Sequence, residues 1–271
     1  MDGIDVNSAL RSSATERAPT ASWRKLALAA GALYLLTFIS IPRLALFGPV
    51  LNDPAYILSS GSDTGVLVGV LLEMIVSVAI VGTGVALYPV LKRQNEGVAL
   101  GFVTARLFET GIIVVGIIAL LSVATLRQNG VPAAGDAASL VTTGQALVAI
   151  QNWTFRIGQG LMPGINALLL GYLLYRSGLV PRVIPALGLI GAPLIISSAI
   201  GQVFGINEQI SVWSGVATLP IFLWELSLGL WLVFKGFKPS AMALLASRAS
   251  GTEASVTAPA PVAVARKAGA A

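Results

Sequence analysis

The chain of 271 residues contains no histidine and no cysteine. These two absences exclude disulfide bonds, thiol catalysis, histidine-ligated haem, His/Cys zinc sites and Ser–His–Asp triads. The sequence also lacks a phosphate-binding P-loop, a GxSxG motif and a dinucleotide-binding glycine pattern. We therefore expect no enzymatic activity, no cofactor and no metal site.

Charged residues are scarce as well. They make up 11% of the chain, whereas a typical soluble domain carries about 25%. Hydrophobic residues make up 55%, and the mean hydropathy is +0.84. The apolar residues gather in six runs, near residues 23–41, 66–90, 99–126, 154–175, 183–204 and 213–234.

These runs have the length of membrane-spanning helices. At about 1.5 Å of rise per residue, roughly 20 residues cross the roughly 30 Å hydrocarbon core of a bilayer. The pattern predicts an all-α fold, a polytopic integral membrane protein whose residues 23–240 form a bundle of six transmembrane helices. Residues 1–22 and 241–271 are polar or rich in alanine and proline, and we expect them to be disordered tails.

Lysine and arginine are distributed unevenly between the two sides of the predicted bundle. Thirteen of the 17 lie in the tails and in the loops after the second and fourth runs, whereas only Arg43 and Arg127 lie in the opposite, outer loops. Cytoplasmic loops carry the basic excess in membrane proteins. The pattern predicts a multi-pass protein of the cell membrane with both termini in the cytoplasm. The basic excess on the cytoplasmic side also accounts for the net charge of +5. We therefore expect no nucleic-acid partner.

Two longer loops are expected on the outer side, at residues 42–65 and 127–153. Within the second loop, residues 137–151 could form an interfacial helix that leads into the fourth run.

Five charged side chains lie inside the apolar runs: Glu73, Arg106, Glu109, Arg156 and Glu225. A charge at the centre of a bilayer costs about 2.5–3.5 kcal/mol on insertion scales, so such residues face protein or water. Glu225 is closest to the midplane, and we expect Glu109 as its neighbour, with Arg106 below. Glu73 and Arg156 lie near the outer side and are expected to pair. Alternatively, Arg106 only extends to the cytoplasmic headgroups, because its helix is longer than the bilayer is thick.

Polar and small residues recur every three or four positions on three of the runs, which places them on one helix face. Lipid satisfies no hydrogen bond, so we expect these faces to turn toward a common interior. The stripes are Gly69, Glu73, Ser77, Ile80 and Gly84; Asn152, Arg156, Gln159, Pro163 and Asn166; and Thr218, Phe222, Glu225 and Gly229. The predicted polar core comprises Glu73, Arg106, Glu109, Arg156, Gln159, Asn166 and Glu225.

Four stretches of the chain resemble a known family. They are FGPVLNDPAYIL (Phe47–Leu58), LYPVLKRQNEGVALGFVTARLFET (Leu87–Thr110), NALLLGYLLYRSGLVPRVIPALGLIGAP (Asn166–Pro193) and WELSLGLWLVFKGFKPS (Trp224–Ser240). Together they are similar to the bacterial membrane proteins of domain-of-unknown-function family 4386, over residues 23–240. The resemblance implies a compact multi-helix integral membrane protein, with no assigned reaction, substrate or cofactor.

Two functions remain open from the sequence. One is a small-molecule, ion or proton-coupled carrier with Glu225 and Glu109 at its core. It is favoured because the apolar runs contain three Glu but only two Arg, so that one carboxylate lacks a counter-charge. The other is a structural or regulatory membrane subunit whose buried charges only determine how the helices pack. An intramembrane enzyme with paired carboxylates is disfavoured. The lipid bilayer is the one expected partner, and a homo-oligomer or a second membrane protein stays an open alternative.

Overall fold

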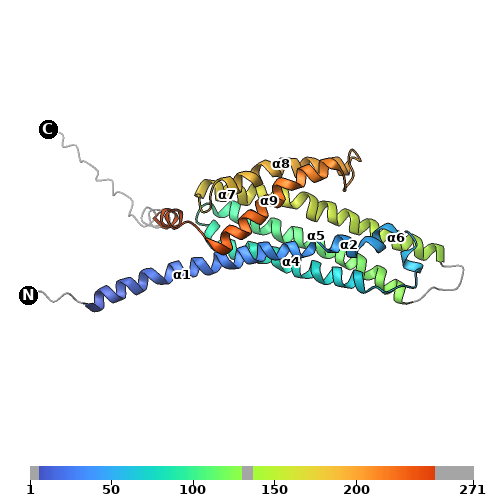
Figure 1. Cartoon of the computed structure of the whole chain (residues 1–271), viewed down its shortest axis with the longest axis horizontal. Coiled ribbons are helices and arrows are strands. Elements are labelled where there is room, and N and C mark those ends of the chain that lie inside the picture. Colours follow the sequence, from blue (N-terminus) through green and yellow to red (C-terminus); the bar gives the residue numbers. More distant parts are fainter. Residues whose placement is uncertain (1–5, 130–136, 248–271) are drawn as a thin grey trace, which may run out of the picture.

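The computed structural model describes residues 6–129 and 137–247, with residues 6–21 described by their backbone alone. Within these ranges every regular element is a helix (Figure 1). The elements are α1 (Val6–Thr37), η1 (Phe38–Ser40), α2 (Arg43–Leu46), α3 (Gly48–Asn52), η2 (Tyr56–Leu58), α4 (Thr64–Leu91), α5 (Glu96–Gln128), α6 (Ala137–Phe155), η3 (Arg156–Leu161), α7 (Met162–Ser177), α8 (Val183–Val203) and α9 (Val212–Phe234). A further helical segment covers residues 239–247.

Five helices in the described part are long and apolar enough to cross a membrane. They are α4, α5, α8, α9 and the continuous helix Ala137–Ser177, which joins α6, η3 and α7. These helices contain the last five apolar runs of the sequence. The all-α class and a multi-pass membrane protein are therefore confirmed to that extent.

Helix α1 is longer than the sequence predicts. It begins at Val6, within the stretch 1–22 that was expected to be disordered. Its apolar part, residues 23–37, contacts both α4 and α9. Once such packing holds one part of a helix, each further turn adds hydrogen bonds at little entropic cost, and the helix continues into a polar sequence.

Helix α6 lies within the predicted loop at 127–153, where residues 137–151 were expected to form a helix leading into the fourth run. Residues 137–155 do form a helix that continues into the next one, and it lies along α5. Gln151 is 3% exposed and occupies the space beside Gly116, where any Cβ would collide with it. Contact with α5, rather than a strongly apolar composition, keeps this segment in the bundle.

The predicted C-terminal tail, residues 241–271, is helical over its first residues. Ala241 and Leu245 are 8% and 1% exposed and belong to the core. Their i, i+4 spacing places them on one helix face, which explains why they are buried together. Residues 248–271 lie outside the described part of the chain.

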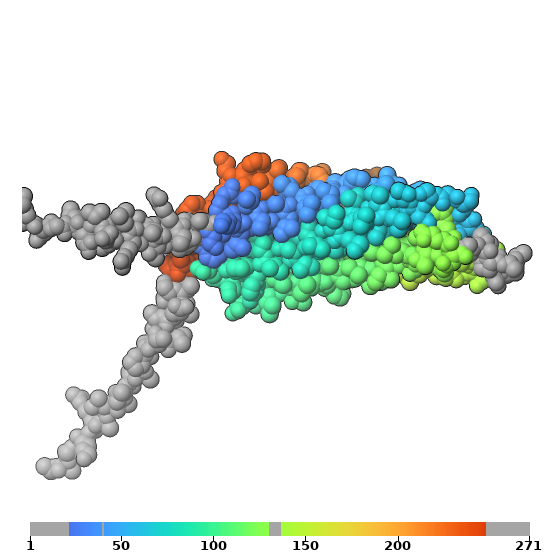
Figure 2. All heavy atoms as spheres, turned by 90° about the horizontal axis from the view of Figure 1, so that it is seen from below, coloured from blue at the N-terminus to red at the C-terminus, as the bar shows by residue number. Residues whose placement is uncertain are grey.

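The bundle is elongated, and its helices cover different parts of its length. α4, α5 and the joined α6–α7 run along its length, whereas α8 and α9 accompany only one half (Figure 1). α1, α4 and α5 lie side by side on one long face (Figure 2), in agreement with their contacts. We call the end that holds the 239–247 segment the inner end and the opposite end the outer end.

Two apolar cores follow one another along the bundle. The inner core lies among α1, α7, α8 and α9 with the inner halves of α4 and α5, and it includes Phe102, Leu170 and Trp224. The outer core lies among α2, α3 and η2 with the outer halves of α4 and α5, and it includes Phe47 and Ile113. The α5 residues between Phe102 and Ile113 therefore cross a seam between the two cores.

Local sequence signals account for several helix ends. The side chain of Asn95 accepts a hydrogen bond from the Val98 amide and caps α5, and Ser211 caps α9 in the same way through the amide of Ser214. Gly178 ends α7 in the left-handed conformation, with φ of 66°, which glycine adopts without a Cβ penalty.

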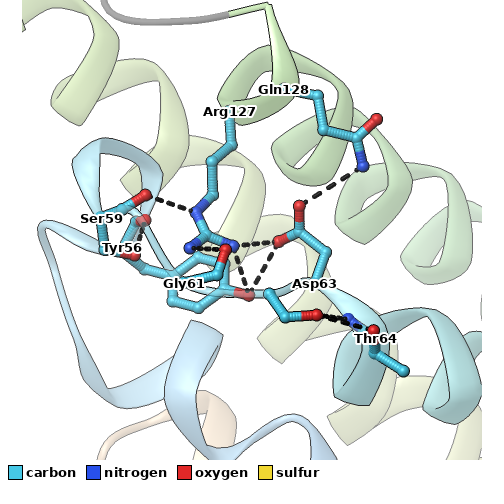
Figure 3. Close-up of polar contacts among 8 residues, drawn as sticks. Tyr56, Ser59, Gly61, Asp63, Thr64, Arg127 and Gln128 are labelled. Atoms are coloured by element: carbon cyan, nitrogen blue, oxygen red, sulfur yellow. Dashed lines mark hydrogen bonds and ion pairs between the residues drawn. The ribbon is translucent and has the colours of Figure 1, made fainter.

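Arg127, at the end of α5, ties the outer loop to the bundle (Figure 3). Its guanidinium donates to the carbonyl oxygens of Ser59 (2.9 Å) and Gly61 (2.7 Å), to the Tyr56 hydroxyl (3.2 Å) and, as an ion pair, to Asp63. Burial, together with a hydrogen bond to Asp63, raises the pKa of Tyr56, so its hydroxyl stays protonated and donates to that carboxylate. The loop before α4 is thereby anchored by one arginine.

The crossing of α1 and α9 provides a test of the fold. A Cβ at Gly31 would lie 2.8 Å from both the carbonyl oxygen of Gly229 and the amide nitrogen of Val233, which are backbone atoms and cannot rotate away. We expect Gly31→Ala to destabilise the protein by about 1–3 kcal/mol through overpacking. The measurement is the thermal unfolding midpoint in detergent.

Gly111→Ala is the matched control, since no atom lies within 4 Å of a Cβ at that position. It should leave the midpoint unchanged or raise it slightly, because alanine is the better helix former. Equal midpoints for both variants would contradict the close α1–α9 crossing.

Candidate functional site

A group of polar residues lies near the middle of the membrane-spanning helices. Counted from the inner helix ends at about 1.5 Å per residue, Arg106 lies about 15 Å along α5, Asn166 about 16 Å along α7 and Glu225 about 14 Å along α9. Half of a roughly 30 Å hydrocarbon core is the same distance. These three side chains therefore lie at one level of the bundle, about half the thickness of a membrane core from the inner helix ends.

Arg106 is the centre of this group and is 3% exposed. Its Nη1 donates to Oε2 of Glu109 at 3.0 Å, and its Nη2 donates to the Tyr34 hydroxyl at 2.6 Å. The guanidinium carbon also lies 5.1 Å and 5.4 Å from the ring centroids of Tyr34 and Phe102, close enough for cation–π attraction. Arg106 thus does not extend to the headgroups, and that alternative was wrong.

Glu109 is held from two helices. It lies one turn after Arg106 on α5, so the two side chains meet at i, i+3. The same Oε2 accepts a hydrogen bond from Nδ2 of Asn166 on α7 at 2.7 Å. Glu109 and Asn166 are 3% and 2% exposed, so this carboxylate is enclosed by its donors.

Glu225 is held much less tightly. Its Oε1 lies 3.9 Å from Nη2 of Arg106, and no hydrogen bond reaches its carboxylate from the described residues. Its side chain is 20% exposed, against 4% for Glu109. Two carboxylates therefore share one guanidinium, and the group carries a net charge of −1 when all three are ionised.

A cavity of about 190 Å³ adjoins these charges. Its polar lining comes from α5, η3 and α9 and consists of Arg106, Glu109, Gln159 and Glu225. The remaining lining residues, from α1, η1, α4, α7 and α9, are Thr37, Phe38, Ile41, Val76, Ile80, Pro163 and Phe222. Helices two, four and six of the sequence prediction therefore do meet at a common interior, as do Glu109 and Glu225.

A second charge pair lies nearer the outer end. Glu73, about 27 Å along α4 from its inner end, is 1% exposed and forms an ion pair with Arg43 of α2. Its Oε1 also accepts from Nε2 of Gln159 at 3.0 Å. The sequence predicted Arg156 as the partner of Glu73, and this was wrong. Arg156 instead stacks on Trp153, with 4.8 Å between the guanidinium carbon and the ring centroid.

The cause of the error is the short helix α2. The sequence assigns Arg43 to an outer loop, but α2 continues from the end of α1 along α4 and buries Arg43 to 5% exposure. Arg43 then pairs with Glu73 and stacks on Phe155, 4.6 Å from its ring centroid. No periodicity in the sequence indicates that this segment packs against α4.

A π-helical turn brings Gln159 to the cavity. In η3 the amide of Met162 donates to the carbonyl of Ile157, five residues earlier, and Pro163 follows directly. Proline has no amide hydrogen and its ring displaces the carbonyl four residues before it, that of Gln159. A π turn adds a residue to the helix and is frequent at functional sites. Gln159 thereby reaches both Glu73 and the cavity.

The seven predicted core residues are thus partly brought together. Arg106, Glu109, Gln159 and Glu225 line the cavity, while Asn166 and Glu73 are bonded to residues that do. Arg156 does not line it. On α9 the predicted stripe is incomplete, since Thr218 and Phe222 are exposed.

Sequence reasoning missed Tyr34 and Arg43. Tyr34 lies within an apolar run and is 1% exposed, and a buried tyrosine hydroxyl usually needs a hydrogen-bond partner. That rule, applied to an aromatic inside a membrane helix, would have indicated Tyr34.

A family model described as a domain of unknown function, DUF4386, matches residues 29–236, which are 208 of the 271 residues. The chain belongs to this family. The DUF4386 match begins before Tyr34 and ends after Glu225, so both charge clusters lie within the family unit. No curated protein and no solved structure matches the chain.

The outer charge pair of this DUF4386 protein can be tested by a double-mutant cycle. Glu73→Gln leaves a buried guanidinium without its anion, and Arg43→Gln leaves a buried carboxylate without its cation, so each should cost about 3–5 kcal/mol. The double variant should cost clearly less than the sum, because neither charge is left unpaired. Unfolding free energies in detergent provide the measurement. Additive costs would show that the two residues do not interact.

Proposed function

We propose that the protein is a six-helix protein of the cell membrane with both termini in the cytoplasm. The sixth span is the apolar part of α1, which packs between α4 and α9. The two basic residues of the outer loops, Arg43 and Arg127, are both neutralised in ion pairs. This agrees with the rule that free basic charge gathers on the cytoplasmic side.

The inner loops have the contacts expected at a membrane interface. Their four basic residues each stack on an aromatic ring, which is the arrangement that amphipathic side chains adopt at a membrane interface. The pairs are Lys92 on Tyr88, Arg93 on Trp23, Arg176 on Tyr172 and Arg182 on Tyr175.

We further propose that the protein is a carrier for a small cation or for protons, with Glu225 as the binding carboxylate. One observation carries this proposal: Glu225 and Glu109 share a single guanidinium, and Glu225 faces the cavity. A buried carboxylate without a full counter-charge attracts a cation or takes up a proton.

The Arg106 guanidinium has two possible states, one closer to Glu109 and one closer to Glu225. It is hydrogen-bonded to Glu109 at 3.0 Å and lies 3.9 Å from the Glu225 oxygen, so it can divide its charge between them. A cation on Glu225 would repel the guanidinium and strengthen its bond to Glu109. Loss of the cation would draw it back, which links occupancy of the cavity to the packing of α5 against α9.

The second candidate is a structural or regulatory subunit. It is favoured by the pairs Arg43–Glu73 and Arg106–Glu109, in which each charge meets its opposite inside the same chain. Buried pairs of this kind can determine helix register without binding anything. Under this function Glu225 contributes to packing, and a partner protein would be expected to co-purify.

Glu225→Gln separates the two functions. We expect charge displacement in proteoliposomes after jumps of Na⁺, K⁺, methylammonium or H⁺, and a loss of at least about tenfold in the variant, since an amide neither binds a cation comparably nor exchanges a proton. The variant should fold with an unchanged or higher thermal midpoint, because a buried and incompletely paired charge is removed. Solid-supported membrane electrophysiology and thermal unfolding provide the two readings.

Glu208→Gln makes the same change at an exposed loop carboxylate and should retain wild-type currents. Full currents in Glu225→Gln would contradict the carrier. Absence of current in the wild type, together with a lower thermal midpoint for Glu225→Gln, would favour the structural subunit.

The topology can be tested because the chain contains no cysteine. In intact cells, a membrane-impermeant maleimide should label Ala138→Cys, at the exposed outer start of α6, and should not label Lys92→Cys, in the exposed inner loop. Lysed cells should label both. Labelling of Lys92→Cys alone in intact cells would reverse the orientation.

A further inference from the structure

The midplane cavity has an exposed side between η1 and α9. The two most exposed lining residues, Ile41 at 54% and Phe222 at 38%, follow η1 and lie on α9. Phe222 lies about 18 Å along α9 from its inner end, which is within the hydrocarbon core. This side of the cavity therefore faces lipid and not the aqueous phase.

A second hollow continues from this opening toward the outer end. It has a volume of about 370 Å³ and follows the outer turns of α9 from Gln209 through Thr218 to Phe222. Phe222 lines both spaces. The two spaces border the same side chain, and we call the path from Gln209 past Phe222 to Glu225 the lateral groove.

An aromatic pair stands where the groove meets the cavity. The rings of Phe38 and Phe222 meet edge to face, with centroids 5.2 Å apart and planes at 86°. Ring faces attract cations, and the apolar residues Val76 and Ile80 line the cavity further in. The walls are thus suited to an apolar body that carries a positive charge.

The polar end of the cavity has matching chemistry. Its three charged groups, Arg106, Glu109 and Glu225, sum to −1 when ionised, which selects a cation over an anion. The Oε1 atom of Gln159 is buried without a hydrogen-bond partner among the described residues, and Gln159 lines the same cavity.

We propose that the substrates are lipophilic protonated amines, which enter from the outer leaflet through the lateral groove and place their ammonium group at Glu225. This rests on the proposed carrier function and adds the substrate class and the route. The apolar body packs against the Phe38–Phe222 pair, and the ammonium group pairs with Glu225.

Three probes distinguish the contribution of the apolar body from that of the positive charge. Each is added to purified protein reconstituted in nanodiscs. Adamantylammonium has an apolar body and a cation, adamantane carboxylate has the same body and an anion, and methylammonium has the cation alone. We expect adamantylammonium to bind at least about tenfold more tightly than either of the others. Ligand-observed NMR titration measures the three affinities, with empty nanodiscs subtracted to remove partitioning into lipid.

Phe222→Ala should weaken adamantylammonium binding at least fivefold and leave methylammonium binding unchanged, since only the apolar body contacts this ring. Leu223→Ala is the matched control, because Leu223 is 41% exposed on the same helix and lines neither the cavity nor the outer hollow. It should bind all probes as the wild type does. If Phe222→Ala fails to fold, Phe222→Leu takes its place, since leucine preserves bulk and removes the aromatic ring.

The outcomes separate this inference from the carrier itself. Glu225-dependent binding of methylammonium without tighter binding of adamantylammonium would overturn the substrate class and leave the carrier standing. Equal adamantylammonium binding in Phe222→Ala and in the wild type would overturn the lateral route. Absence of adamantylammonium binding would overturn the substrate class, and so would equal binding of the carboxylate. The carrier itself is judged separately, by the Na⁺, K⁺ and H⁺ currents of the wild type and of Glu225→Gln.

Discussion

The burial of one guanidinium in the middle of the apolar helices is the constraint on which the rest of the structure depends. Arg106 is surrounded by hydrocarbon-facing helices, so every donor that remains unpaired there is costly. The guanidinium donates hydrogen bonds to Glu109 on α5 and to Tyr34 on α1, and it lies within ion-pair distance of Glu225 on α9. Three helices that are distant in sequence must therefore meet at one depth, and their relative register follows from that meeting.

The seam around Arg106 also explains why the protein has two apolar cores. Close-packed aliphatic side chains cannot continue through a layer of charges, so the inner core ends at Phe102 on α5 and the outer core begins at Ile113. Where α9 and η1 meet this layer, no further helix among the described elements covers it, and the cavity opens. The outer core is closed instead by α2, α3 and η2, with Arg127 as its anchor.

Much of the candidate site could be predicted from the sequence, because charge inside a membrane helix has few acceptable positions. Glu109, Glu225 and Asn166 were placed at one interior by depth and helical period alone, and they meet there. The partner of Glu73 could not be predicted in this way. Arg43 belongs to a four-residue helix whose position beside α4 depends on packing between distant segments. The same limit applies to α6, whose residues become a continuous helix through contact with α5.

The sequence by itself determined the all-α class of the protein, the five apolar runs that the membrane-length helices contain and the position of each buried charge along its helix. These properties follow from hydropathy and from the fixed rise of a helix, which are local. Only the tertiary structure decided which charges are satisfied. Arg106 is nearer to Glu109 than to Glu225, Glu73 is paired with Arg43, and Glu225 faces the cavity without a hydrogen bond from the described residues. Pairing of this kind depends on how helices rotate and cross, and a one-dimensional pattern does not contain that information.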